Sequence, residues 1–299
     1  PMSRGLGDVY KRQKYEFWHH YFSQLKQKNV PTFVISAIFR PSQIFFKPYG
    51  KLFRNILKQT THIFVQNEKS QQLLQTINVL ETSIAPDTRF DRVFEHSENV
   101  KSLTAIRRFK GKRKMILMGS SWPKDEKLIV ELIHQAVFLE NFCFVFAPHE
   151  IKSSQMYELE KALHYDTVRY SALEHSGNWD KKALIIDNIG MLSSIYQYAD
   201  YAYVGGGFGV GIHNVLEAAV FGMPIFFGPN YHAFQEARDL LDLGVAISIR
   251  NATDLSKALL DFEENEEMYI EKSKTARHYV KKHTGGTTFV LREIEKYLK

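Results

Sequence analysis

The sequence is poor in cysteine and has no long apolar run, and each absence excludes a class of protein. Its single cysteine, Cys143, lies in the apolar stretch at residues 142–146, where a small buried side chain is the expected role. One cysteine excludes a disulfide framework and a cysteine-based metal site. No stretch approaches the ~20 apolar residues that span a bilayer, and nothing reads as a secretory signal. These features predict a soluble, cytoplasmic chain.

Acidic residues are scarce near the N-terminus. The chain has a formal net charge of +6, and residues 1–60 hold eleven Lys or Arg against two acids, Asp8 and Glu16. This imbalance favours an anionic partner, which could be nucleic acid, an anionic membrane or a phosphorylated substrate. Composition leaves these three open. With 299 residues, 44% of them hydrophobic, the chain is long enough for two domain cores.

The apolar pattern divides the chain into five segments. Residues 1–13 have no apolar period, and we expect them to be a non-native leader. Residues 14–95 open abruptly on a helical pattern, so we expect them to be the C-terminal part of an N-terminal domain, with strands at 31–36 and 63–66. The polar residues 96–113 are the expected linker. Residues 114–283 are then a second domain, and residues 284–299 a C-terminal helix.

The second domain has strand-like runs that alternate with helix-like segments. The strands are expected at residues 115–118, 143–146, 183–186, 202–204, 225–227 and 245–247, and helices at 125–137, 155–163, 192–199 and 213–221. This alternation predicts an α/β fold with a doubly wound parallel sheet. Ligands of such sheets bind beyond the carboxyl ends of the strands, so the turns after strands form the candidate site.

The most informative turn is the glycine-rich run at residues 205–211, G-G-G-F-G-V-G. Its glycines let backbone approach an anionic or ribosyl ligand, but no register fits the dinucleotide pattern G-x-G-x-x-G. Asn214 and Glu217 share one face of the helix expected to follow, where the carboxylate can accept two ribose hydroxyls. The alternative is a glycine turn with a capping asparagine and a glutamate favoured near a helix N-terminus.

The order of these motifs resembles the donor domain of GT-B glycosyltransferases, and within them the 3-deoxy-manno-octulosonate (Kdo) transferases. The glycine turn, the His-Asn-x-x-Glu segment and G-M-P-I-F-F-G-P at residues 222–229 carry the first resemblance. The second is carried by Y-E-F-W at 15–18, similar to the family's T-E-L-W, by D-T-R-F-D-R-V at 87–93, and by G-S-S-W-P at 119–123, similar to G-S-T-W-P. These segments follow the family order from about residue 14 onward.

The resemblance implies a GT-B fold of two Rossmann-like domains, the N-terminal one incomplete. It implies inverting transfer of Kdo from CMP-Kdo to a lipid A precursor, lipid IVA, in lipopolysaccharide synthesis. The partners would be CMP-Kdo, the lipid A precursor and the anionic surface of the bacterial inner membrane at its cytoplasmic face. No cofactor, metal or nucleic acid is implied.

The resemblance also assigns residues. Glu16 and Arg89 would stabilise the transition state, while the general base would lie in a segment absent from the chain, leaving the chain by itself inactive. Relatives typically carry Arg at the position of His149 and Glu at that of Met191, so side-chain contacts there stay open. The CMP-binding residues would be Ser120, Pro148, His149, Ile189, Gly190, Met191, Gly207, His213, Asn214, Val215, Leu216 and Glu217.

Residues 40–58 interleave cations with aromatic side chains. Arg40, Lys47, Lys51 and Arg54 would face the phosphorylated acceptor or the membrane that holds it. The alternative is an ordinary helix whose phenylalanines enter the core. Two other functions stay open for the chain: a GT-B enzyme with a UDP-sugar donor, or a non-enzymatic protein that binds nucleotide or nucleic acid.

Overall fold

The computed structural model describes residues 10–13, 17–164 and 166–297. The chain forms two compact units, one of residues 1–92 together with 283–299, and one of residues 93–282. It passes from the smaller unit to the larger one within α4 (Thr88–Glu98) and returns after α13 (Glu266–Lys282). Among the described residues, no helix is both long enough and apolar enough to cross a membrane.

The smaller unit contains a four-stranded parallel sheet in the order β1-β2-β3-β4. The expected strands are confirmed as β2 (Thr32–Ala37) and β3 (His62–Val65). Two more strands were not expected. β1 (Tyr10–Gln13) lies within the segment set aside as a leader, and its backbone pairs with β2; β4 (Thr82–Ile84) is short and has no buried side chain to form an apolar run.

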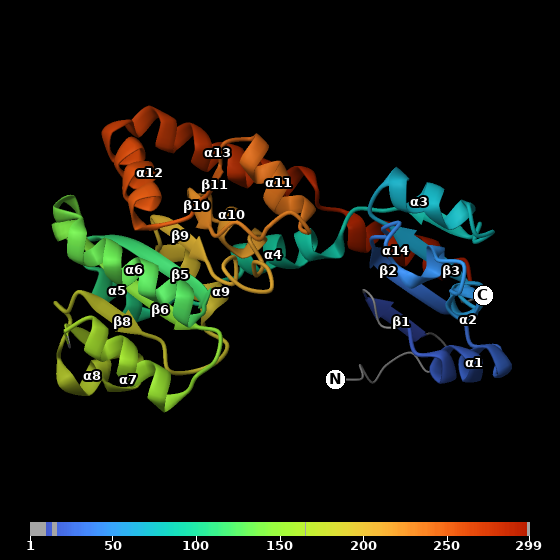
Figure 1. Ribbon diagram of the computed structural model, residues 1–299, viewed down its shortest axis with the longest axis horizontal. Coiled ribbons are helices and arrows are strands. Elements are labelled where there is room, and N and C mark those ends of the chain that lie inside the picture. Colours follow the sequence, from blue (N-terminus) through green and yellow to red (C-terminus); the bar gives the residue numbers. More distant parts are fainter. Residues whose placement is uncertain (1–9, 14–16, 165, 298–299) are drawn as a thin grey trace. The chain divides into compact units, whose positions relative to one another are not determined.

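Helices cover both faces of this sheet. On one face, α1 (His19–Gln27), the 3-10 turn η1 (Ile44–Phe46), α2 (Lys51–Leu57) and α3 (Glu68–Gln75) bury side chains such as Phe22, Leu57 and Leu74. On the other, Val290 and Ile294 of α14 (Gly286–Glu295) pack with aromatic residues of β2 and β3. Figure 1 shows α14 beside these strands. The last helix of the chain therefore completes the core of its first domain.

The larger unit contains a seven-stranded parallel sheet in the order β11-β10-β9-β5-β6-β8-β7. All six expected strands are confirmed, and β7 is additional. The chain adds strands on one side of β5 and then returns to add β9 to β11 on the other, which confirms the doubly wound topology. The switch point lies between β5 and β9. The strands are β5 (Lys114–Ser121), β6 (Phe142–Pro148), β7 (Thr167–Arg169), β8 (Ala183–Ile185), β9 (Tyr201–Val204), β10 (Ile225–Phe227) and β11 (Ala246–Ser248).

The central strands are buried on both faces, as parallel strands between two helical layers require. On one face Ile116 and Phe144 pack against α6, α7 and α12. The segment expected as a linker contains α5, whose Ile106 and Phe109 are buried. The helices are α5 (Thr104–Lys110), α6 (Pro123–Gln135), α7 (Ser153–Ala162), α8 (Tyr170–Ser176), α9 (Leu192–Ile195), α10 (Leu216–Ala219), α11 (Gln235–Asp242) and α12 (Ala252–Glu264), with 3-10 turns η2 (Val137–Asn141) and η3 (Tyr196–Tyr198).

Candidate functional site

Three aromatic rings meet at the switch point of the larger sheet. They are Trp122 after β5, His149 after β6 and His213 in the turn after β9. The His149 ring stacks on Trp122 with centroids 4.6 Å apart and on His213 at 4.5 Å. Trp122 donates from Nε1 to Nε2 of His213 over 3.0 Å. The structure thus brings together two predicted site residues, His149 and His213, around a tryptophan.

A buried carboxylate ties two of these turns together. Asp125, in the first turn of α6, is 1% exposed. Its Oδ2 accepts from the backbone N–H groups of Trp122 and Gly206, both at 2.9 Å, and its Oδ1 accepts from the hydroxyl of Tyr203 at 2.7 Å. Burial and this carboxylate raise the pKa of Tyr203, so its hydroxyl stays protonated and donates. Asp125 therefore fixes the glycine turn against the start of α6.

The glycine turn is packed closely enough to exclude side chains. A Cβ on Gly205 would lie 2.2 Å from the carbonyl oxygen of Ser120, and one on Gly207 would lie 2.5 Å from the amide of Gly228. Ser120 itself has a φ of +52°, where the register of β5 against β6 shifts. These glycines are thus required by the approach of neighbouring turns, independently of any ligand.

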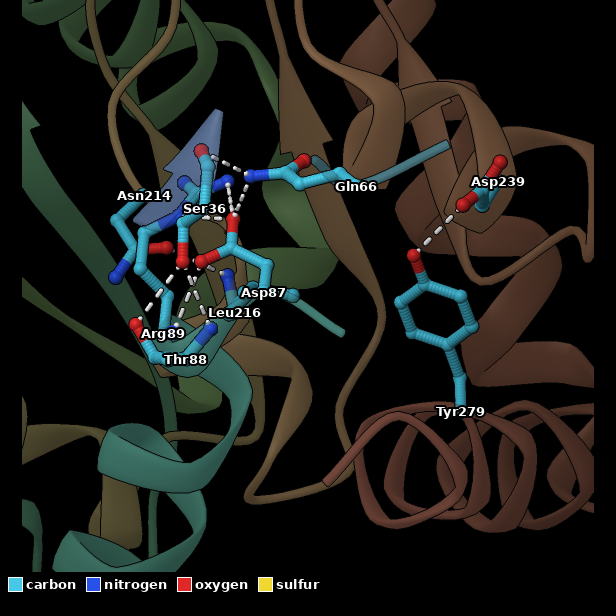
Figure 2. A network of polar contacts seen from close by, with 9 residues as sticks. All are labelled: Ser36, Gln66, Asp87, Thr88, Arg89, Asn214, Leu216, Asp239 and Tyr279. Carbon is cyan, nitrogen blue, oxygen red and sulfur yellow. Dashed lines mark hydrogen bonds and ion pairs between the residues drawn. The ribbon is translucent and has the colours of Figure 1, made fainter. Parts of the chain in front are cut away.

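Asn214 and Glu217 lie together, but the expected helix is shorter than the sequence predicts. Asn214 donates from Nδ2 to Glu217 at 3.1 Å and accepts at Oδ1 from the amide of Leu216 at 3.3 Å (Figure 2 draws the second contact). This local bond holds a turn, and α10 begins only at Leu216. Glu217 is half-buried, whereas the side chains of Val215 and Leu216 are fully buried, so only their backbone is available for the predicted contact.

The turn after β8 carries the remaining predicted donor residues. Ile189 is 92% exposed, Gly190 has a φ of +94°, and the carbonyl of Met191 accepts from the amides of Ser194 and Ile195 in α9. Pro148 ends β6, the strand between β5 and β8. These residues share the carboxyl edge of the sheet with the ring cluster.

A second polar group occupies the carboxyl edge of the smaller sheet (Figure 2). Asp87 accepts at Oδ2 from Nε of Arg89 at 2.8 Å and from Nε2 of Gln66 at 2.7 Å, and at Oδ1 from the amide of Arg89 at 3.0 Å. Ser36, at the end of β2 with a φ of +53°, contacts Thr88 through its hydroxyl at 3.1 Å. The guanidinium of Arg89 is thereby oriented by a carboxylate that is almost fully buried.

The predicted acceptor residues differ in their surroundings. Arg54 donates to the carbonyl oxygens of Phe45, Lys47 and Pro48, which gives its guanidinium a role within the fold. Lys51 is exposed at the start of α2, and Lys47 is half-buried. Arg40 has polar contacts, including its amide to Gln43 at 2.9 Å. Glu16 lies outside the described residues.

Sequence reasoning did not include several residues that shape these two groups. Trp122 stands in the quoted G-S-S-W-P turn, and Asp125 follows three residues later, the spacing of a helix N-terminal carboxylate. The turn motif and this spacing could have indicated both residues from the sequence. Gln66 is the last residue of an expected strand, but nothing in its sequence neighbourhood indicates that it reaches Asp87.

Comparison with known proteins confirms the resemblance that the motifs indicate. Residues 8–92 match the sequence model of the family described as 3-deoxy-D-manno-octulosonic-acid transferase (kdotransferase). The 3-deoxy-D-manno-octulosonic acid transferase of Chlamydophila psittaci is 31% identical over 176 residues, covering 55% of this chain and 38% of that protein. Its counterpart in Chlamydia pneumoniae is 23% identical over 299 residues, covering 94% and 66%. The chain thus spans 38% to 66% of the length of these two relatives.

Solved structures support the fold. A putative UDP-N-acetylglucosamine 2-epimerase from Listeria monocytogenes matches 90% of this chain and 68% of its own with a TM-score of 0.63 and 14% identity. The UDP-GlcNAc 2-epimerase of Neisseria meningitidis, bound to UDP-GlcNAc, matches 89% and 70% with a TM-score of 0.61 and 15% identity. At these identities the likeness concerns the fold alone, and it confirms the GT-B class.

Proposed function

We propose that this chain functions in a Kdo transferase, which moves Kdo from CMP-Kdo onto a lipid A precursor with inversion at the anomeric carbon. The observation that carries the proposal is the meeting of Trp122, His149 and His213 at the switch point of a doubly wound sheet. Nucleotides bind there in such sheets. The match of residues 8–92 to the Kdo transferase family supports Kdo as the transferred sugar.

In this proposal the larger unit holds the CMP moiety. Glu217 is half-buried in α10, just after the turn that carries His213. Its carboxylate accepts the ribose hydroxyls and is held in place by Asn214. His149 and His213 face the phosphate, and the backbone of residues 189–191 contacts the base. These roles need no metal and no cofactor.

Arg89 is the residue that we propose to stabilise the negative charge that develops in the transition state. Its guanidinium is held by Asp87, which in turn is held by Gln66, so the cation is oriented before substrate binds. It stabilises charge on the departing CMP phosphate or holds the donor carboxylate, and Glu16 assists. Inversion requires one displacement, with a base on the acceptor hydroxyl and CMP leaving from the opposite face. We assign the base to no residue of this chain.

We propose that the lipid acceptor binds at the surface formed by α1, α2 and their flanking turns. Trp18, Tyr21, Tyr49 and Leu52 are between 55% and 75% exposed there, on these two helices or just before them, and the helices pack against each other. Lys51 adds an exposed cation. Aromatic side chains interspersed with lysine suit an anionic lipid surface, in keeping with a lipid-linked acceptor at the cytoplasmic face of the inner membrane. Binding to anionic vesicles should fall for Tyr49→Ser combined with Lys51→Glu but not for Lys274→Glu on α13.

The test of the donor is calorimetry on the full chain with CMP, UDP and NAD. We expect CMP to bind most tightly, and Glu217→Ala to weaken it while Glu267→Ala, in the exposed first turn of α13, does not. Tighter binding of UDP would replace the donor with a UDP-sugar. Preference for NAD, or salt-dependent binding to random DNA without affinity for CMP, would refute the proposal.

A further inference from the structure

The geometry of the ring cluster determines which way one hydrogen bond points. The planes of Trp122 and His213 differ by 10° and their centroids are 6.4 Å apart, so the two rings lie side by side. The indole nitrogen can only donate, because its lone pair belongs to the aromatic system. Nε2 of His213, 3.0 Å away, must therefore accept. An imidazole that accepts at Nε2 is neutral and carries its proton on Nδ1.

The charges around His213 agree with a neutral ring. Burial, and then the neighbouring His149, lower the pKa of His213, while Asp125 acts in the opposite direction. Nδ1 makes no hydrogen bond with any described residue. Among the described residues, the fully buried side-chain atoms without a hydrogen-bond partner belong to His62, His96 and Ser273. Nδ1 of His213 is not one of them although it has no partner, so it is not sealed from solvent. It is an N–H donor open to a ligand.

We propose that Trp122 is a positioning residue, which fixes the proton of His213 on Nδ1 so that Nδ1–H donates to an anionic phosphate oxygen of the nucleotide. This inference rests on the proposed function. A phosphate is the group that fits, because it offers charged acceptor oxygens, and Asp125, the carboxylate that acts on the pKa of His213, accepts from Trp122, Gly206 and Tyr203 and makes no hydrogen bond with Nδ1. His149 lies over both rings and keeps them coplanar. No proton is transferred; the device acts by orientation.

The experiment uses the full chain and the variant Trp122→Phe, which keeps an aromatic surface beneath His149 and removes the N–H. Calorimetry measures affinity for CMP and for cytidine, which lacks the phosphate. Two-bond 1H–15N NMR reports the tautomer of His213, whose signal is identified by its loss in His213→Ala. Trp179→Phe, at a tryptophan that stacks with Arg108 instead, is the matched control.

We expect wild-type His213 to be protonated on Nδ1 alone and Trp122→Phe to show a mixture of tautomers. CMP affinity should fall about tenfold in Trp122→Phe, with cytidine affinity unchanged, because only a hydrogen bond to a charged group is lost. His213→Ala should weaken CMP binding at least as much. Adding Trp122→Phe to it should cost nothing more, since Trp122 acts through His213.

Four results would overturn the inference. A proton on Nε2 in the wild type does so whether or not any variant folds. Unchanged CMP affinity in Trp122→Phe would show that the tryptophan does not position His213 for binding. An equal loss of affinity for CMP and for cytidine would show that Trp122 acts by stacking on the base. If the wild type binds no CMP at all, the proposed function fails and the inference with it, whereas the first three results leave the proposed function standing.

Discussion

Asp125 gives the sharpest test of how the candidate donor site is built. Its carboxylate is buried and accepts hydrogen bonds from two amides and from the hydroxyl of Tyr203. Asp125→Ala leaves three buried donors without an acceptor, each at a cost of about 1–3 kcal/mol. The network responds partly as one unit, so we expect a loss of about 3–5 kcal/mol in the free energy of unfolding.

Asp125→Asn is the matched variant. Its amide oxygen can accept from the amides of Trp122 and Gly206, and its NH2 can donate to the phenol oxygen of Tyr203, whose own proton then loses the acceptor that Asp125 supplies. The two backbone contacts survive without their charge assistance. We expect a cost of about 1–2 kcal/mol, less than half that of Asp125→Ala.

The assay is chemical denaturation of the full chain, followed by a probe in the larger unit because two units need not unfold together. CMP affinity is measured for each folded variant, and it should fall in Asp125→Ala because the glycine turn is no longer fixed. The reasoning is wrong if the two variants are equally destabilised, or if Asp125→Ala costs under about 1 kcal/mol, the value of a single exposed contact.

Three other side chains provide separate tests. Burial raises the pKa of Glu126 above its ordinary value of 4.5, so the folded state keeps this proton to a higher pH than the unfolded state does, and the free energy of unfolding falls as pH rises through that window. Glu126→Gln should make this fall smaller when chemical denaturation is measured at about pH 4 and pH 7, and an unchanged pH dependence would contradict the assignment. Glu217→Ala should weaken CMP binding by about 1–3 kcal/mol in calorimetry, and unchanged affinity would leave Glu217 only its contact with Asn214. In a protein that also carries the segment with the general base, Arg89→Ala should lower the single-turnover rate about a hundredfold with CMP affinity nearly kept, and Arg89→Lys should recover part of the rate; a rate loss that matches the loss of folded protein would make Arg89 structural.

The fold of the larger unit could be predicted from the sequence because its strands are buried on both faces. Such strands appear as short continuous apolar runs, and all six that were expected are confirmed. β4 and β7 were not expected, because each has three residues and few buried side chains. The placement of α14 on the first sheet could not be predicted either, since it depends on contacts between residues more than 200 positions apart.

The candidate site was predicted less completely than the fold. The turns were identified because strand ends are visible in the sequence, and His149 and His213 do lie together. The helix expected at residues 213–221 was too long at its start, because the side chain of Asn214 accepts a hydrogen bond from the amide of Leu216 and α10 begins only at Leu216. Trp122 and Asp125 were missed as site residues because their importance lies in contacts between turns that are far apart in sequence.

Packing separates what the glycine turn needs for folding from what it leaves available for binding. Gly205 and Gly207 are explained by the backbone that approaches them, and Val215 and Leu216 by the core. Such residues would be required in this fold with any ligand or with none. Exposed His149, half-buried Glu217 and the Nδ1 of His213 satisfy no such requirement, because the surrounding chain leaves each of them at least partly accessible. In the proposed function, the specificity of the turn for a nucleotide therefore depends on these three groups, and substitutions there should change affinity more than stability.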